Sequence, residues 1–600
     1  MNLFIAGQGG APVDLERPRR ALSELLVELP FFSPEAIESW RAPTGHACLC
    51  SVSTDPAQAG GIRYTYFERS RGALFSGRPV RWSSDARADG RLAIDAKRYV
   101  GPDDGWMAEL DGRCTVVRAD DEHLDVYTDP LGAYPVFETR AAGMRWFSNN
   151  AAALRLLCGD DSLDEAALAS VLAGGWSLQG QPIWRSVRRL ERGSVLRIDA
   201  GGVERRRQLL PVTTITRMPG GRLEPRAAAT SLVELTAALA DWPGRPSVVP
   251  VTGGRDSRLV LAAAMSAGIE FDAATGGGAG DPDVQIASRL CSLVGIGHSL
   301  LAPDPHGDRF SDIRTAARIT LLASGCTATL ADAAGFPLGP RGGALPLWHS
   351  GQGGEIARSY YGVGGRGVAE LLYRRFTGRR PGRAEIVSAA AAQLLKGRIA
   401  SFVEEMTDSG AELVDVPDLF YLLERMGSWS AAAHGVVELI RDTTSPLWSV
   451  RMLPHLLALP ARQRELERFH RLVLGELDPR LAGPRFQDGS TWSEHRYPLQ
   501  RRVQRTRRLA GKAAAELRRR RPAQVSARGQ GDTGTLAPAD PFSSVISVVR
   551  DAALSQPDHP AWAVLHRPAV ETLLAGPPAR LDDMSRYYVW RLASVFLGMA

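Results

Sequence analysis

At residues 249–258 the chain reads Val249-Pro250-Val251-Thr252-Gly253-Gly254-Arg255-Asp256-Ser257-Arg258. This run predicts a short buried strand, a glycine loop and the start of a helix. Glycine lets the backbone approach a phosphate group without a Cβ clash. The first turn of a helix offers unpaired N–H groups at the positive end of its dipole. A bare Gly-Gly is also typical of an ordinary strand-to-helix turn. The hydroxyls of Thr252 and Ser257 favour a phosphate site. A carboxylate placed among phosphates predicts Asp256 as a ligand of Mg²⁺.

The sequence around this run predicts a parallel sheet. We expect a strand at Ser247–Val251 and a helix at Leu259–Ala267, followed by a second strand at Phe271–Thr275 and a second helix at Asp283–Val294. Strand, loop, helix, strand and helix is the βαβ pattern of an α/β domain. The loop is not a Walker loop, because the Gly-Lys-Ser/Thr ending is absent.

Residues 1–215 read mainly as strands and turns. Cys48–Ser53 and Cys114–Arg118 are short apolar runs, and Leu124–Thr128 alternates before the turn signal Asp129–Gly132. This pattern predicts an antiparallel, sheet-rich α+β domain.

The remaining chain divides at a segment rich in proline and glycine. Residues 211–225 read as a linker, and we place the boundary itself at 216–226. Residues 227–600 then form a second domain, which is expected to be mostly helical from Ala384 to Leu474. Its arginine-rich stretch at about 498–540 is expected to be a flexible insertion.

Composition narrows the class of protein. Hydrophobic residues are 44% and charged residues 23%, which is ordinary for a globular enzyme. The six cysteines are too sparse for a disulfide scaffold and lack a zinc-binding spacing, which favours a reducing cytoplasm. Cys48 and Cys50 are expected on one face of a strand. There is no apolar run long enough to span a membrane and no signal peptide pattern.

The net charge of +6 raises the question of a nucleic-acid partner. Much of the excess lies between Arg496 and Arg528, and no aromatic residues are interleaved with it as a base-stacking platform. The distribution of this charge, rather than its sum, therefore argues against nucleic acid as a partner.

The complete string from Thr252 to Ser257 resembles the pyrophosphatase-type nucleotide loop of the asparagine synthetase superfamily, Ser-Gly-Gly-x-Asp-Ser. Thr252 stands in place of the first serine. The resemblance implies a PP-loop synthetase domain, similar to the adenine nucleotide α-hydrolases, that cleaves ATP to AMP and pyrophosphate. It implies that Thr252, Gly253, Gly254, Asp256 and Ser257 bind the nucleotide.

Two further segments carry the resemblance. Thr275 and Gly276 end the second strand, where the family lines its adenosine pocket. Ser350-Gly351-Gln352-Gly353-Gly354-Glu355 is similar to the family's pyrophosphate loop Ser-Gly-Glu-Gly-x-Asp. The match implies that Ser350, Gly351, Gln352 and Gly353 bind pyrophosphate. It also implies that Glu355 and Asp256 hold Mg²⁺ against the leaving group.

A late part of the chain resembles the family's acceptor region. Asp442–Trp448 followed by Arg451 is similar to Arg-x-Pro-Phe-Leu-Asp, although Ser449 replaces the usual aspartate. Glu424 and Glu438 are candidates for a general base that deprotonates the attacking amine. Helix glutamates of this kind are more often salt-bridged surface residues.

The first 215 residues resemble the family's glutaminase domain, an N-terminal nucleophile sandwich. Leu110-Asp111-Gly112, Asp129–Pro135 and Phe147-Ser148-Asn149 carry this likeness, with Pro130 in place of arginine. Glutaminase chemistry needs a cysteine directly after the initiator methionine. Asn2 stands there, and a carboxamide cannot be the nucleophile, so we expect an inactive domain.

Relatives with an inactive N-terminal domain include β-lactam synthetases and lasso-peptide cyclases, which adenylate a carboxylate and close a ring with an internal amine. Gln352 matches neither the family glutamate nor the tyrosine of the β-lactam branch. The C-terminal lysine of that branch has no clear counterpart except Lys512. The length and the basic stretch favour the peptide-cyclase branch, with a precursor peptide and its processing protease as partners.

Three readings of function follow. The first is an ATP- and Mg²⁺-dependent amide ligase that forms an acyl-adenylate and closes a macrolactam. The second is an asparagine synthetase that converts aspartate with free ammonia. The third is a non-catalytic nucleotide-binding or peptide-binding scaffold. A carboxylate substrate and an amine acceptor are expected under both enzymatic readings.

Overall fold

The computed structural model describes residues 2–29, 36–53, 62–82, 93–101, 104–243, 245–301, 313–325, 327–330, 346–378, 385–439, 441–492, 541–577 and 581–599. The predicted insertion at 498–540, with Lys512 and the arginine-rich stretch, lies outside these residues.

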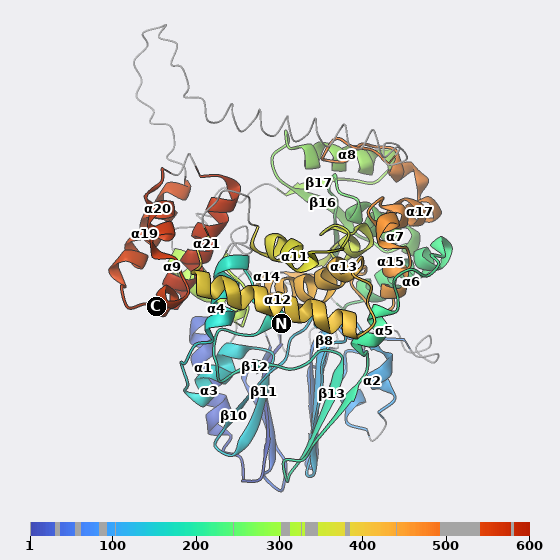
Figure 1. Ribbon diagram of the computed structural model, residues 1–600. Helices are drawn as coiled ribbons and strands as arrows, with labels where there is room; N and C mark the ends of the chain where they lie inside the picture. The colour runs from blue at the N-terminus through green and yellow to red at the C-terminus, as the bar shows by residue number, and fades with distance from the viewer. Residues whose placement is uncertain are drawn as a thin grey trace, which may run out of the picture.

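The N-terminal half contains two six-stranded antiparallel sheets (Figure 1). The first has the order β12 (Arg188–Arg189), β10 (Phe137–Ala141), β11 (Met144–Ser148), β1 (Asn2–Gly9), β3 (Ala47–Ser53) and β2 (Glu38–Arg41). The second has the order β14 (Glu204–Gln208), β13 (Ser194–Asp199), β9 (His123–Tyr127), β8 (Cys114–Asp120), β5 (Arg71–Gly77) and β4 (Thr65–Phe67). A short ribbon joins β6 (Val80–Arg81) to β7 (Leu110–Asp111).

The two sheets pack face to face because alternate strand residues point to opposite sides. Phe4 and Phe147 from the first sheet share one apolar core with Leu74 and Val126 from the second. The other face of the first sheet packs under α1 (Glu16–Glu28) and α3 (Ala151–Cys158), and Cys48 and Cys50 both belong to that core. The predicted shared face of these cysteines is confirmed.

Short helices complete this half. The outer face of the second sheet is covered by η4 (Ala96–Tyr99) and α2 (Trp106–Glu109). Helix α4 (Glu165–Gly174) lies between β11 and β12 in the chain, and η5 (Leu178–Gly180) comes after it. The half is therefore an α+β sandwich, as the strand pattern predicted.

The second half is built on a five-stranded parallel sheet. Its order is β17 (Ser299–Leu301), β16 (Asp272–Gly276), β15 (Ser247–Pro250), β18 (Leu347–His349) and β19 (Asp442–Thr444). Helices α7 (Asp256–Ala267) and α8 (Pro282–Val294) follow β15 and β16, so the predicted βαβ unit is confirmed. Strand β19 lies within the region expected to be helical. The sequence did not indicate it, because three residues are too few to carry a local strand signal.

The stretch expected to be a linker contains α5 (Val212–Thr216) and the start of α6 (Pro225–Ala240). Proline fits the first turn of a helix, where its missing N–H would be unpaired in any case. Pro225 therefore begins α6 rather than ending a linker.

Helices make up most of the remaining described chain. They are α9 (Ile313–Ala323), η6 (Gly354–Arg358), α11 (Val368–Thr377), α12 (Ala389–Asp408), α13 (Val416–Phe420), the π-helix η7 (Tyr421–Ser430), α14 (Ala431–Val437), α15 (Leu453–Leu457), α16 (Ala461–Arg464), α17 (Arg468–Leu477), η8 (Pro479–Ala482), α19 (Pro541–Ser555), η10 (Pro560–Ala563), α20 (Arg567–Ala575) and α21 (Asp583–Gly598). Helix α12 runs along the boundary between the two halves (Figure 1). Among the described helices, none has the length and apolar content needed to cross a membrane.

Candidate functional site

Two glycine loops meet at one edge of the parallel sheet. β15 and β18 are parallel neighbours, so the segments that follow them emerge at the same edge. A Cβ on Gly354 would lie 2.1 Å from Oδ1 of Asp256, and a Cβ on Gly351 would lie 3.0 Å from the Asp256 carbonyl carbon. The second loop can therefore approach Asp256 only where it carries glycine. These are the two loops that the sequence analysis selected for phosphate binding.

The first loop is held by hydrogen bonds to neighbouring elements. The N–H of Gly253 donates to Oδ1 of Asp283 on α8 at 2.8 Å, and its carbonyl accepts from the N–H of Gln487 at 3.2 Å. The hydroxyls of Thr252 and Ser257 lie 3.0 Å apart. The loop is thus shaped before any ligand binds.

Thr275 and Gly276 end β16 beside this loop. The Thr275 hydroxyl donates to the Val251 carbonyl at 2.5 Å and lies 2.8 Å from Nε2 of His298. Gly276 is exposed, and a Cβ there would meet no atom within 4 Å. Thr275 therefore joins two strands through its side chain, and its predicted contact with adenosine stays a prediction.

Asp256 and Glu355, the predicted metal pair, lie on either side of one arginine. Nη2 of Arg358 is 2.9 Å from Oδ2 of Asp256 and 3.7 Å from Oε1 of Glu355. The other Asp256 oxygen is 2.7 Å from Nε2 of His470, a buried residue of α17. The second Glu355 oxygen accepts the N–H of Gly353 at 3.2 Å.

Burial and charge act on the two carboxyls in opposite directions. Burial tends to raise the pKa of Asp256, but Arg358, His470 and Arg255 outweigh it and hold that pKa below its ordinary value. Burial and the neighbouring charge of Asp256 raise the pKa of Glu355 to about 7. The pair therefore has one firmly ionised member and one that ionises less readily.

A magnesium ion does not fit this pair in the arrangement described. Both oxygens of Asp256 already contact basic groups, and the Arg358 guanidinium lies close to both carboxylates. Within the described residues there is no cluster of three or more histidine, cysteine, aspartate or glutamate side chains that could hold a metal. Mg²⁺ at Asp256 and Glu355 therefore stays a prediction that requires Arg358 to move.

The second loop is anchored at both ends. The N–H of Ser350 donates to the Thr444 carbonyl at 2.7 Å, and the Gln352 side chain accepts from the Ser430 hydroxyl at 3.0 Å. Gly353 has φ +97°, a conformation that favours glycine, and a Cβ there would lie 2.9 Å from Trp448. The loop is thus packed against β19 and the end of η7.

Two arginines of the first loop hold the segment that covers it. Arg255 donates to Glu467 at 2.7 Å and to Ser490 at 2.9 Å. Arg258 is fully buried and donates to the carbonyls of Leu481 and Pro484. Both guanidinium groups lie over the ring of Phe486, at 4.0 and 4.3 Å from its centre. These arginines add positive charge close to the loop.

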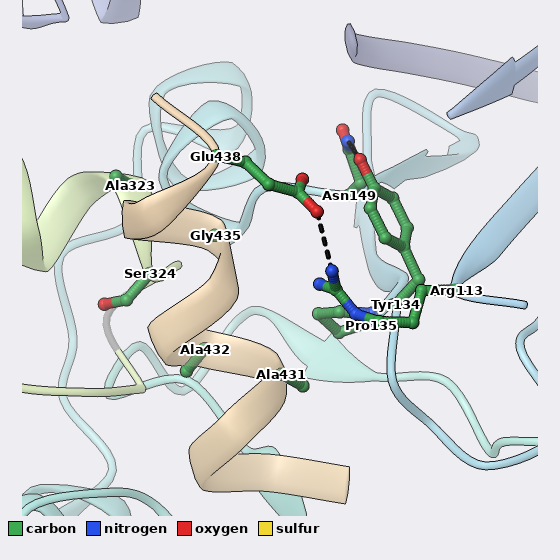
Figure 2. Close-up of a pocket in the computed structure, with 10 residues that line it drawn as sticks. All are labelled: Arg113, Tyr134, Pro135, Asn149, Ala323, Ser324, Ala431, Ala432, Gly435 and Glu438. Atoms are coloured by element: carbon green, nitrogen blue, oxygen red, sulfur yellow. Dashed lines mark hydrogen bonds and ion pairs between the residues drawn. The ribbon is translucent and has the colours of Figure 1, made fainter. Parts of the chain in front are cut away.

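The two candidate bases lie at the contact between the halves. Glu438 follows α14 and pairs with Arg113 at 2.8 Å, as the dashed line in Figure 2 shows. Glu424 on η7 accepts the N–H of Gln179 at 2.6 Å, and burial raises its pKa. Both carboxylates are buried, which differs from the expected surface position, and their role as bases stays a prediction.

The predicted acceptor segment is attached to the N-terminal half. Asp111 accepts from the Ser449 hydroxyl at 2.6 Å and from the N–H groups of Val450 and Arg451 at 3.1 and 3.2 Å. This contact gives a reason for serine at 449, because an aspartate there would face the Asp111 carboxylate.

The start of the chain is buried in the sandwich. Nδ2 of Asn2 donates to the Phe75 carbonyl at 2.9 Å, and its Oδ1 accepts from the Ser51 hydroxyl at 2.6 Å. The Asn149 side chain donates to the Asn2 carbonyl at 2.7 Å. Both atoms of the carboxamide are thus used in structural hydrogen bonds.

Sequence reasoning did not select Arg358 and His470. Arg358 could have been selected from the sequence, because it stands three residues after Glu355 in the predicted pyrophosphate loop region. His470 could not have been selected, because 214 residues separate it from Asp256. No local pattern marks it.

Comparisons with known proteins add little to this geometry. No protein-family model matches the chain, and no curated protein matches it. Among solved structures, it is similar to glutamine phosphoribosylpyrophosphate amidotransferase from B. subtilis complexed with ADP and GMP, at 10% identity and a TM-score of 0.24. A second match is the allosteric regulatory enzyme of purine biosynthesis, at 11% identity and a TM-score of 0.24. Each alignment covers 46% of this chain and 65% of the other, which is less than two thirds of its length. A similarity of this degree identifies neither the family nor the activity.

Proposed function

We propose that this protein is an enzyme that activates a carboxylate with ATP as an acyl-adenylate and passes it to an amine, releasing AMP and pyrophosphate. The observation that carries the proposal is the meeting of two glycine loops after the parallel strands β15 and β18. Loops of this kind at the carboxyl edge of an α/β sheet are a common place for nucleotide phosphates.

The charge around the loops supports an anionic ligand. Arg255, Arg258 and Arg358 all lie at or beside them, and α7 begins at Asp256 with the positive end of its dipole toward the loop. Arg255 and Arg358 already pair with Glu467 and Asp256, so a triphosphate would have to share these guanidinium groups with the carboxylates. The loop N–H groups and the end of α7 would then orient it and stabilise the charge that develops on leaving pyrophosphate. No step of this proposal depends on the predicted Mg²⁺ at Asp256 and Glu355.

The N-terminal half bears on the source of the amine. Asn2 stands where the resembling glutaminases need a nucleophile, and its carboxamide is engaged by Ser51 and Phe75. The proposal therefore takes the amine from the substrate rather than from glutamine. Ring closure within a peptide, giving a macrolactam, is the form of this reaction that we propose.

The test is substrate-dependent ATP–pyrophosphate exchange by the purified protein in buffer containing Mg²⁺. The acids compared are aspartate and a panel of linear peptides with side-chain carboxylates. Exchange with a peptide alone supports ring formation and identifies the carboxylate. Exchange with aspartate, followed by asparagine on addition of ammonia, would replace the macrolactam proposal with an asparagine synthetase. Absence of exchange with every acid would contradict adenylation.

Asp256→Ala should reduce exchange by at least about 100-fold, because it removes the loop carboxylate that positions Arg358 and His470. The matched control is Asp272→Ala, which removes an exposed carboxylate at the start of the neighbouring strand β16. Equal exchange rates in the two variants would rule out a role for Asp256.

A further inference from the structure

A polar cavity lies between the two halves, away from the glycine loops. Its volume is about 370 Å³, within the range of roughly 300–1,000 Å³ that is usual for small-molecule sites. One wall comes from the region of β12 to β14, and the other from α12 and η7. The residues that line it include none from the two glycine loops. The cavity is therefore a separate place, large enough for a small metabolite.

Two arginines on its wall lack a carboxylate partner among the described residues. Arg188 pairs with Glu138, and Arg206 pairs with Glu191. Arg189, in contrast, donates to the Gly132 carbonyl at 2.7 Å, and Arg192 donates to the Leu423 carbonyl at 3.3 Å. A guanidinium removed from water without an anion is costly to hold.

Two glycines lie beside the guanidinium group of Arg189. Gly132 and Gly180 have φ values of +70° and +62°. A Cβ on Gly132 would lie 2.8 Å from Nη2 of Arg189, and a Cβ on Gly180 would lie 2.1 Å from its Nη1. Both loops thus pass close to the guanidinium group of Arg189. Its N–H groups donate to the Gly132 carbonyl at 2.7 Å and to the Ser428 hydroxyl at 3.4 Å, and these bonds orient it as a preorganised binding group.

The acidic residues of the cavity are not all directed at Arg189 and Arg192. Glu138 and Glu191 are engaged with Arg188 and Arg206. Glu424 is buried, which raises its pKa, and its charge acts on both Arg189 and Arg192. Glu405 is exposed on α12 at the side of the cavity. Arg189 and Arg192 thus lie on the cavity wall without an ion pair of their own among the described residues, and an anion in the cavity would meet both guanidinium groups.

We propose that this cavity binds a small molecule carrying a carboxylate or phosphate group, which Arg189 and Arg192 hold between the two halves of the protein. Guanidinium groups suit both anions because their planar N–H donors match two oxygens at once. The site is independent of the amide-forming activity proposed above, and its binding requires no ATP.

The test is isothermal titration calorimetry of the full chain without nucleotide, with sodium citrate and inorganic phosphate as separate probes. Arg192→Gln should weaken binding by about tenfold or more, because it removes a charged hydrogen-bond donor. Arg192→Lys should recover part of the affinity through its charge. The matched control is Arg140→Gln, which removes an exposed arginine of β10 from outside the cavity.

A second variant guards against misfolding at Arg192. Val212→Trp places a large side chain at the cavity wall without changing its charge, and it should also weaken binding. Binding of citrate alone would indicate a carboxylate ligand, and binding of phosphate alone would indicate a phosphate ligand. Two outcomes would overturn the proposal. One is the absence of saturable binding of either probe, and the other is equal affinity in wild type, Arg192→Gln and Val212→Trp.

Discussion

At the scale of single residues, Arg358 is the side chain that most changes the interpretation of the two predicted phosphate loops. Two carboxylates near each other suggest a cation site, and the cation found near both is a guanidinium. Arginine keeps its charge at all physiological pH values, so it neutralises Asp256 permanently. A metal ion would have to compete with it for the same oxygens.

Replacing Arg358 should therefore expose the metal site that the sequence predicts. In Arg358→Met, we expect Mn²⁺ to bind about tenfold or more tightly than in wild type, because two carboxylates lose a competing charge. The free Mn²⁺ signal in electron paramagnetic resonance measures this without substrate. Arg366→Met, at an exposed arginine, serves as the control. Unchanged Mn²⁺ affinity would show that Arg358 does not block the site.

At the scale of elements, the loops depend on glycine where they touch. Gly354 leaves no room for a side chain beside Asp256, whereas Gly365 has no atom within 4 Å of a built Cβ. The two positions thus form a matched pair within one segment of chain.

Gly354→Ala should destabilise the protein by about 1–3 kcal/mol, the usual cost of forcing an extra methyl group into a packed region. It should also weaken ATP binding, since it pushes the second loop away from the first. Gly365→Ala should change neither quantity. Thermal unfolding and nucleotide titration measure the two effects. An unchanged melting temperature in Gly354→Ala would contradict the close contact described.

His349 ties three strands of the parallel sheet together. Its ring nitrogens lie 3.0 Å from the Ser247 hydroxyl and 3.1 Å from the Thr444 hydroxyl. Burial, with a smaller effect of Arg78, lowers its pKa to about 4. The neutral ring is therefore the form that the folded sheet favours.

This lowered pKa predicts an acid-sensitive sheet. A histidine with a folded pKa below its unfolded value stabilises the fold fully above about pH 6.5 and loses that contribution as the pH falls toward 4. The loss is roughly 3 kcal/mol. His349→Gln should be less stable at neutral pH but should lose less stability on acidification. Unfolding across this pH range, with exposed His566→Gln as control, measures the difference. Equal pH slopes would contradict the prediction.

At the scale of the whole molecule, the N-terminal half holds the predicted acceptor segment of the second half by polar contacts. Arg113 pairs with Glu438, Arg78 pairs with Asp442, and Asp111 binds the segment at Ser449. All of these side chains are buried. The sandwich therefore has a structural task even if it has no glutaminase activity, because it positions the chain around β19.

The Arg113–Glu438 pair allows this coupling to be measured. Arg113→Met should cost about 3–5 kcal/mol, because it leaves Glu438 as an uncompensated buried charge. The double variant Arg113→Met/Glu438→Leu should recover much of that loss, since apolar residues can replace a buried ion pair. Thermal unfolding of both singles and the double gives the coupling energy. Additive effects would show that the two residues act separately.

The sequence by itself determined the features that are written in local patterns. Alternation predicted the strands of the sandwich, and the strand, Gly-Gly and helix around Thr252 predicted the βαβ unit and the loop after β15. The position of the second loop was predicted from resemblance alone. These signals are local because periodicity and glycine act within a few residues.

Only the tertiary structure decided what surrounds those loops. His470 reaches Asp256 across 214 residues, Arg358 turns back between the two carboxylates, and Glu424 and Glu438 lie buried against the N-terminal half. Strand β19 forms because β18 offers it a partner. The cavity with Arg189 and Arg192 exists only where the two halves meet. Contacts of this kind depend on which surfaces pack together, and neither residue periodicity nor spacing encodes that choice.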